Sequence, residues 1–192
     1  KYSKGLMGLE DFKLIVSKMK NEVDIVTHVS LYNWGEPFLH PELNKIISYL
    51  HENGIAAAVS THLSIVTGGQ IRKVIKAAPE YLKISLSGYY PNEYDVTHAG
   101  GDINLVKSNL YRIRYFINQF KSNTLVDVNY HLYTNNNGKN LKKMQELCDE
   151  LDFSLSTVNS LVMPLERVID YVEGKDEART AELNKILPVT IE

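Results

Sequence analysis

Strand-like and helix-like segments alternate along almost the whole chain, and this alternation constrains the fold more than any other feature. Apolar residues spaced by three or four positions predict helices, whereas short β-branched runs predict strands. Helices are predicted over residues 7–19, 69–78, 102–119, 141–151 and 164–172, and another begins at Pro41 and ends before Gly54. Strands are predicted over residues 23–32, 55–60, 81–87, 125–133 and 153–158. Such alternation favours an α/β fold with a parallel sheet and right-handed crossovers.

The periodicity alone leaves two shapes open for this sheet. It is either open and doubly wound or curved into a partial barrel. In both cases ligands gather at the carboxyl ends of the parallel strands. The loops that follow the predicted strands are therefore the places to search for function.

The charge balance excludes several classes of partner. The 192 residues include 21 basic and 23 acidic side chains, a formal charge of -2, which does not favour a nucleic-acid or anionic-membrane surface. The longest apolar runs, such as residues 55–59, are too short to cross a bilayer. The first residues also lack the apolar stretch of a signal peptide. We expect a cytoplasmic protein with no membrane and no nucleic-acid partner.

The ends of the sequence indicate a piece of a longer protein. The chain opens on Lys1 and stops abruptly at Pro188-Val189-Thr190-Ile191-Glu192. We expect one domain over residues 1–174, followed by a charged linker or helix over residues 175–192 that leads to a further region.

The loop after the first predicted strand carries the most informative motif. Gly35, Glu36 and Pro37 stand between that strand and the helix that Pro41 begins. The glycine allows a ligand to approach the backbone closely, and the carboxylate is suited to an ammonium group. A Gly-Glu-Pro tripeptide alone is weak evidence, but this context is much narrower.

This region resembles the radical S-adenosylmethionine (SAM) superfamily. LYNWGEPFLHPELNKIISYLHENGI is similar to the second strand, glycine-glutamate loop and second helix of its auxiliary-cluster (SPASM) branch. The upstream GLMGLEDFKLIV resembles the helix that follows the cluster loop. Later segments of the family are resembled by VSTHLS, KISLSGYYPNEYDVTHAGGDINLVKSNL and VDVNYHLYTNNNGKNLKKMQELCDELDF, so that roughly residues 5–170 are covered. The resemblance implies a partial (βα)6 TIM-like barrel with parallel strands. Its first strand and cluster loop are expected upstream of Lys1, and the sequence stops where relatives begin their auxiliary-cluster domain.

The resemblance also implies which residues bind SAM. In the family, the glycine-glutamate loop binds the methionyl amino group, the residues after the next strand shape the cofactor site, and polar residues on later strands contact the ribose or the methionyl carboxylate. Carried over residue by residue, the implied cofactor contacts are Gly35, Glu36, Pro37, Thr61 (with Ser60), Ser85, Ser87, His98, Asn129 and Val162, the last packing on the adenine. Ala99 occupies a loop in which many relatives place an arginine, so carboxylate recognition requires a substitute such as His98 or Arg112.

The resemblance implies a cluster that this sequence does not ligate. Relatives hold a [4Fe-4S] cluster with a C-x-x-x-C-x-x-C loop, whereas this sequence contains one cysteine, Cys148, expected to be a buried apolar residue on a helix. The implied enzyme uses SAM and the cluster to generate a 5′-deoxyadenosyl radical that modifies a peptide, sugar or small metabolite. Its electron donor is expected to be a flavodoxin or ferredoxin. The chain as given is expected to be inactive.

Two other interpretations stay open. The first is a cluster-less relative that retains the barrel as a binding or scaffold domain. The second is a conventional α/β enzyme with acid/base chemistry at Glu36 and His98. His28 and His62 are each equally compatible with a structural and a functional role.

Overall fold

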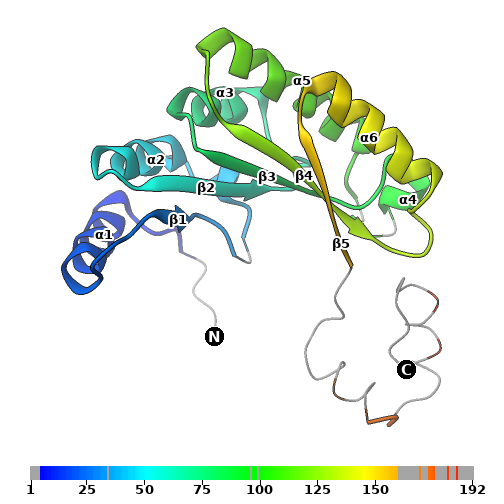
Figure 1. Cartoon of the computed structure of the whole chain (residues 1–192), viewed down its shortest axis with the longest axis horizontal. Helices are drawn as coiled ribbons and strands as arrows, with labels where there is room; N and C mark the ends of the chain where they lie inside the picture. Colours follow the sequence, from blue (N-terminus) through cyan, green and yellow to red (C-terminus); the bar gives the residue numbers. More distant parts are fainter. Residues whose placement is uncertain are drawn as a thin grey trace. The chain divides into compact units, whose positions relative to one another are not determined.

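The computed structural model describes residues 5–33, 35–95, 97–98 and 100–159, together with residues 169, 173–175, 181 and 185. Strands and helices follow one another along the described chain (Figure 1). In chain order they are α1 (Leu9–Glu22), β1 (His28–Ser30), the 3-10 turn η1 (Pro37–Leu39), α2 (Leu43–Glu52), β2 (Ala56–Thr61), α3 (Gly68–Ala77), β3 (Tyr81–Leu86), α4 (Pro91–Asp95), α5 (Ile103–Phe120), β4 (Leu125–Leu132), α6 (Lys139–Leu151) and β5 (Ser154–Asn159).

The five strands form one sheet in the order β1-β2-β3-β4-β5. The pairs β1–β2 and β2–β3 are parallel, with Val29 beside Ala57, Ser60 beside Lys83 and Thr61 beside Ile84. Sequential order with helical crossovers is the topology of a partial TIM-like barrel. The predicted α/β class and parallel sheet are therefore confirmed.

Local chemistry explains where the predicted helices begin and end. The helix α2 buries one apolar side, formed by Leu43, Ile46, Ile47 and Leu50. Gly54 follows it with a φ of 71°, a left-handed conformation that glycine adopts without a steric penalty. At the start of α3, the Thr67 and Gln70 side chains each satisfy a backbone amide of the other residue, which is a capping box.

Three parts of the prediction differ from the structure. The strand predicted over residues 23–32 is only His28–Ser30 long, because β1 lies at the edge of the sheet and pairs with β2 alone. Pro41 lies in a turn and α2 begins at Leu43. The short helix α4 was not predicted. The helix predicted over residues 164–172 lies outside the described residues, except for Ile169.

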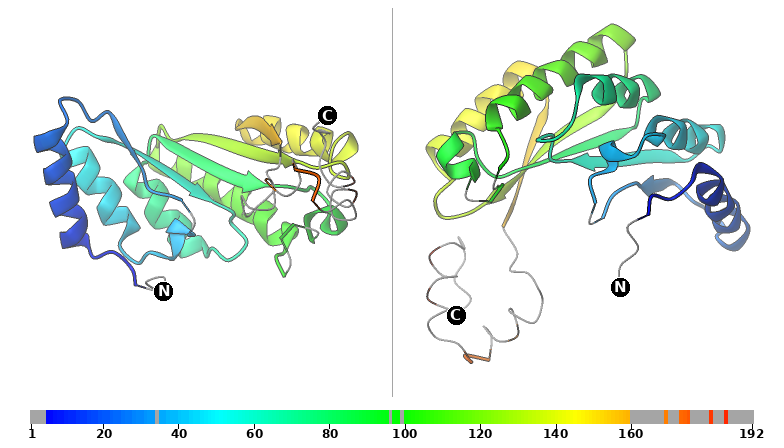
Figure 2. Two further views of the ribbon diagram at one scale, coloured as in Figure 1. Left: turned by 90° about the horizontal axis from the view of Figure 1, so that it is seen from below. Right: turned by 180° about the vertical axis from the view of Figure 1, so that it is seen from behind.

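The chain forms two compact units, which we describe separately: Lys1–Ile84 with Asn104–Asp127, and Ser85–Ile103 with Val128–Glu192. In the first unit, α2, α3 and α5 lie on one face of β2 and β3, and no described helix lies on the other face (Figures 1 and 2). Val59, Leu82 and Ile84 point toward these helices and are completely buried. No described helix is long and apolar enough to cross a membrane.

Candidate functional site

The Glu36 carboxylate fastens the loop after β1. Its Oε1 accepts a 3.1 Å hydrogen bond from the Phe38 amide, so that Glu36 caps the turn η1. Pro37 occupies the first position of this turn, where its missing N–H costs no hydrogen bond. The loop conformation is therefore set by Glu36 itself.

The other carboxylate oxygen, Oε2, reaches the end of β2. It accepts hydrogen bonds from the Thr61 hydroxyl (2.9 Å) and the His62 amide (3.0 Å). The His62 ring adds its Nε2 at 3.3 Å, while its Nδ1 accepts from the Ser64 amide. The Glu36 side chain is only 5% exposed. Through these hydrogen bonds the buried Glu36 carboxylate holds two strand-end loops together.

The loop after β2 is itself unusually constrained. Leu63 is completely buried and has a φ of 59°, which is uncommon for a branched residue. Its amide donates to the Thr61 hydroxyl at 3.0 Å, and Asn109 Nδ2 donates to its carbonyl at 3.0 Å. Arg112 in turn donates to Asn109 Oδ1 at 2.8 Å. Backbone held in such a conformation is typical of binding sites.

A cavity of about 700 Å³ lies beside the Glu36 loop in the first unit. Its lining includes Tyr32, Gly35, Glu36, Pro37 and residues 5–7. His40 connects residues 5–7 to this region. Its Nδ1 accepts from the Glu42 amide, so its Nε2 carries the proton that is donated to the Met7 carbonyl at 2.8 Å. The volume is within the range of cofactor sites.

In the second unit, three polar side chains meet at the end of β3. Ser87 is 2% exposed, and its hydroxyl is hydrogen-bonded to His98 Nδ1 at 2.9 Å and to the Thr97 hydroxyl. The Tyr94 ring stacks on the His98 ring with centroids 4.5 Å apart. The position and the orientation of the His98 ring are therefore both fixed.

Asn136 anchors the start of the same loop. Its side chain is completely buried and donates to the Ser87 carbonyl at 2.6 Å and to the His131 carbonyl at 2.8 Å. Elsewhere in this unit, Asn129 Nδ2 donates to the Ser156 hydroxyl at 2.9 Å. These contacts belong to the scaffold that holds the polar strand ends.

The structure thus brings some of the predicted residues together within each unit. In the first unit, Gly35, Glu36, Pro37 and Thr61 form one cluster. In the second, Ser87 and His98 are in contact, Ser85 is half-buried on β3, and Asn129 pairs with Ser156. Val162 and Ala99 lie outside the described residues.

The sequence interpretation missed four contributors to these clusters. They are Tyr94, Thr97, Asn109 and Asn136. An asparagine inside an otherwise apolar helix face is the signal that would have found Asn109, because a buried amide requires partners.

The described residues do not fit an iron–sulfur cluster. Cys148 is 1% exposed on the buried side of α6, as predicted for an apolar residue. Among the described residues there is no group of three histidine, cysteine or acidic side chains able to hold a metal. A cluster of this type needs several thiolates, whereas Cys148 is the single cysteine of the sequence.

Comparison with known proteins establishes the fold. No protein-family model and no curated protein sequence matches the chain. Solved structures do match it in shape, and three of them illustrate the similarity. Streptococcus suis SuiB bound to S-adenosylmethionine has 16% identity and a TM-score of 0.67, over 92% of this chain and 43% of SuiB. Archaeal TYW1 has 22% identity and a TM-score of 0.52, over 80% of this chain and 56% of TYW1. A domain of pyruvate-formate lyase-activating enzyme from Bacteroides vulgatus has 25% identity and a TM-score of 0.53, over 67% of this chain and 76% of that domain.

These neighbours are radical SAM enzymes, and the chain has the α/β fold that they share, a partial TIM-like barrel. It spans about half or less of the SuiB and TYW1 chains.

Proposed function

We propose that this chain is the SAM-binding core of a radical SAM enzyme of the SPASM branch. The observation that carries the proposal is the buried Glu36 carboxylate, which holds the Gly35–Pro37 loop against the end of β2 through Phe38, Thr61 and His62. The SAM-bound structure of SuiB, which shares the fold, supports the choice of cofactor.

The arrangement suits the positively charged end of SAM. The Glu36 carboxylate accepts hydrogen bonds from Phe38, Thr61 and His62. We assign it the role of fixing the Gly35–Pro37 loop and of placing a carboxylate close to the bound ammonium group. The backbone of Gly35 lines the cavity, and a Cβ built on this residue meets nothing within 4 Å. We assign the methionyl ammonium group to the carbonyls of this loop, with Thr61 holding the loop from β2. Bound SAM would supply a carbon–sulfur bond whose cleavage by one electron from the proposed donor gives methionine and the 5′-deoxyadenosyl radical.

The other cofactor contacts implied by the sequence remain part of the proposal. These are the ribose and carboxylate contacts of Ser85, Ser87, His98 and Asn129, and the adenine contact of Val162. Arg112 donates to Asn109, which favours a role in supporting the β2 loop over direct carboxylate recognition.

The cluster, the substrate and the electron donor are also proposals. We infer that the [4Fe-4S] cluster is ligated by residues outside this sequence. A peptide substrate is the first choice, because a SuiB structure of the same fold contains its precursor peptide SuiA. A flavodoxin or ferredoxin is proposed as donor, and a cytoplasmic location as the setting.

Acid/base catalysis at Glu36 is not favoured by the geometry. A general base must reach a substrate proton, whereas this carboxylate is 5% exposed and already accepts three hydrogen bonds.

Calorimetric titration of the 192-residue chain with SAM tests the proposal. We expect saturable binding, weakened about tenfold or more by Glu36→Gln, since a hydrogen bond or contact to a charged group contributes about 1.5–3 kcal/mol. Glu42→Gln is the matched control, because Glu42 pairs with Lys45 at the surface. Binding unaffected by Glu36→Gln would overturn the site, and absence of SAM binding to the wild-type chain would overturn the proposal.

A further inference from the structure

The uncovered face of the sheet in the first unit carries polar and small side chains. Side chains alternate between the two faces along each strand. On β3, Leu82 and Ile84 are buried under the helices, so Tyr81 and Lys83 point to the opposite face, where they are half-buried. No described helix lies over this part of the sheet (Figure 2).

Lys83 is the cation of this face. Its ammonium group lies 5.1 Å from the centroid of the Tyr32 ring, a cation–π contact. It forms no ion pair with any carboxylate in the described part of the chain. A half-buried charge without a counterion costs free energy that a bound anion would recover.

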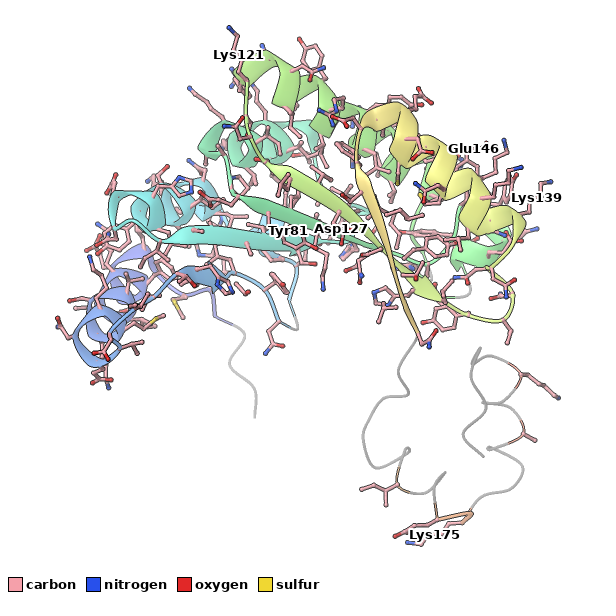
Figure 3. All side chains as sticks on the ribbon, in the orientation of Figure 1. Tyr81, Lys121, Asp127, Lys139, Glu146 and Lys175 are labelled. Carbon is pink, nitrogen blue, oxygen red and sulfur yellow. The ribbon has the colours of Figure 1, made fainter. Side chains whose placement is uncertain are left out.

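The nearest carboxylate on the same face has another partner. Asp127 is 8% exposed and accepts a 2.8 Å hydrogen bond from the Tyr81 hydroxyl, and the two side chains lie together in Figure 3. Asp127 therefore does not supply the counterion that Lys83 lacks.

The strand next to Lys83 presents small side chains on this face of the sheet. On this face β2 presents Ala56, Ala58 and Ser60, and Ser60 is registered directly beside Lys83. On this face the small side chains of β2 therefore lie beside a hydroxyl and an ammonium group. A single lysine and a hydroxyl match the single charge of a carboxylate, whereas phosphate sites generally use several cations or a row of backbone amides.

We propose that Lys83 and Ser60 form a binding site for the carboxylate of a small organic acid or of a substrate. The site lies near the proposed cofactor loop, because Tyr32 comes three residues before Gly35. It is defined by Lys83 and by Ser60, which the resemblance also assigns to the cofactor site, on the opposite face of the sheet from the Thr61–Glu36 contact.

The test is an amide NMR titration of the 192-residue chain with acetate, at constant ionic strength and without SAM. We expect saturable shifts at Ser60 and Lys83. Lys83→Met should weaken binding about tenfold or more, because hydrogen bonds to charged groups contribute about 1.5–3 kcal/mol. Lys121→Met is the control, since Lys121 is exposed at the end of α5, far from Tyr81 in Figure 3.

Each remaining outcome overturns the proposal. Absence of saturable acetate shifts in the wild-type chain, or equal binding by the Lys83→Met variant, would exclude the site. Stronger binding of inorganic phosphate than of acetate would exclude the carboxylate assignment. Because SAM is not present in these titrations, failure here is distinct from failure of the cofactor proposal.

Discussion

The Thr61 hydroxyl donates a 2.9 Å hydrogen bond to Glu36 Oε2, although the two residues lie 25 positions apart in the sequence. Thr61 is the last residue of β2, and Glu36 caps the turn after β1. The hydrogen bond therefore joins the ends of two neighbouring parallel strands. It is also the contact on which the position of the proposed SAM loop depends.

Removing that hydroxyl should affect stability and SAM binding together. Thr61→Val keeps the shape but removes one of the three hydrogen bonds to Glu36 and the hydroxyl that accepts from the Leu63 amide. We expect the free energy of unfolding to fall by about 1–3 kcal/mol, with weaker SAM binding. Urea denaturation and calorimetry measure the two effects. Thr157→Val, at an exposed position of β5, is the control and should change neither. If the Thr61→Val variant is destabilised but binds SAM with unchanged affinity, the Thr61 hydroxyl does not contribute to SAM binding.

The capping box of α3 should have a measurable contribution. Thr67 accepts from the Gln70 amide, and Gln70 Oε1 accepts from the Thr67 amide at 2.8 Å. Thr67→Ala should lower the free energy of unfolding by about 1 kcal/mol, whereas Thr67→Ser should retain most of it. The denaturant midpoints of the Thr67→Ala and Thr67→Ser variants measure this difference. Equal midpoints would show that the Thr67 side chain does not stabilise α3 as a cap.

Stability should decrease in acid partly through Glu80. Partial burial acts to raise its pKa, but hydrogen bonds from the Ala57 amide and from His51 outweigh burial, so the pKa is lowered from its ordinary value of 4.5. A carboxyl with a lowered folded-state pKa contributes stability above the unfolded-state pKa, and this is lost as the pH falls through the folded-state value. Thermal melts between pH 6 and about 3 should therefore show a smaller acid loss for Glu80→Gln than for the wild type. The exposed Glu52→Gln variant should retain the wild-type profile.

The opposite dependence is expected of Tyr81. Burial, together with the hydrogen bond to Asp127, raises the pKa of Tyr81 to about 12. Because the unfolded state ionises first, near the ordinary value of 10, stability should fall as the pH rises above it. Apart from Tyr130, whose pKa burial also raises, NMR titration of the tyrosine ring carbons should show a late titration of Tyr81. Its pKa should move down in Asp127→Asn, and an unchanged value would exclude the Tyr81–Asp127 contact.

A methyl group at Gly88 should disturb the second unit. A Cβ there would lie 2.6 Å from the Tyr94 backbone nitrogen, too close for the backbone to remain in place. Gly88→Ala should lower the free energy of unfolding by about 1–3 kcal/mol and displace the His98 ring. Gly69→Ala, where the nearest atom is 3.9 Å away, is the matched control. Denaturation and the His98 ring shifts by NMR measure both consequences.

The sequence predicted the fold better than it predicted the roles of side chains. Periodicity located β2, β3, β4 and β5 closely, and for the first three the reason is that buried strand residues have a strong apolar pattern. It overestimated β1, whose edge position is decided by pairing and not by composition. The prediction that the Gly35–Pro37 loop and Thr61 belong to one site depended on the resemblance to the radical SAM superfamily. The hydrogen bonds from the Phe38 and His62 amides to Glu36 could not be predicted, since such contacts are set by how the loops pack.

The parallel register of β2 and β3 limits the insertions and deletions that β2 can tolerate. Thr61 and Ser60 are consecutive residues, and one turns toward Glu36 while the other lies beside Lys83 on the opposite face. An insertion or deletion of one residue in β2 would exchange the two directions, so that the hydroxyl that holds the loop and the hydroxyl beside the lysine would both be misplaced at once. Both proposed sites therefore depend on the same register of β2. A shift of one residue in this strand would disrupt both sites, and neither site can move along the strand without the other.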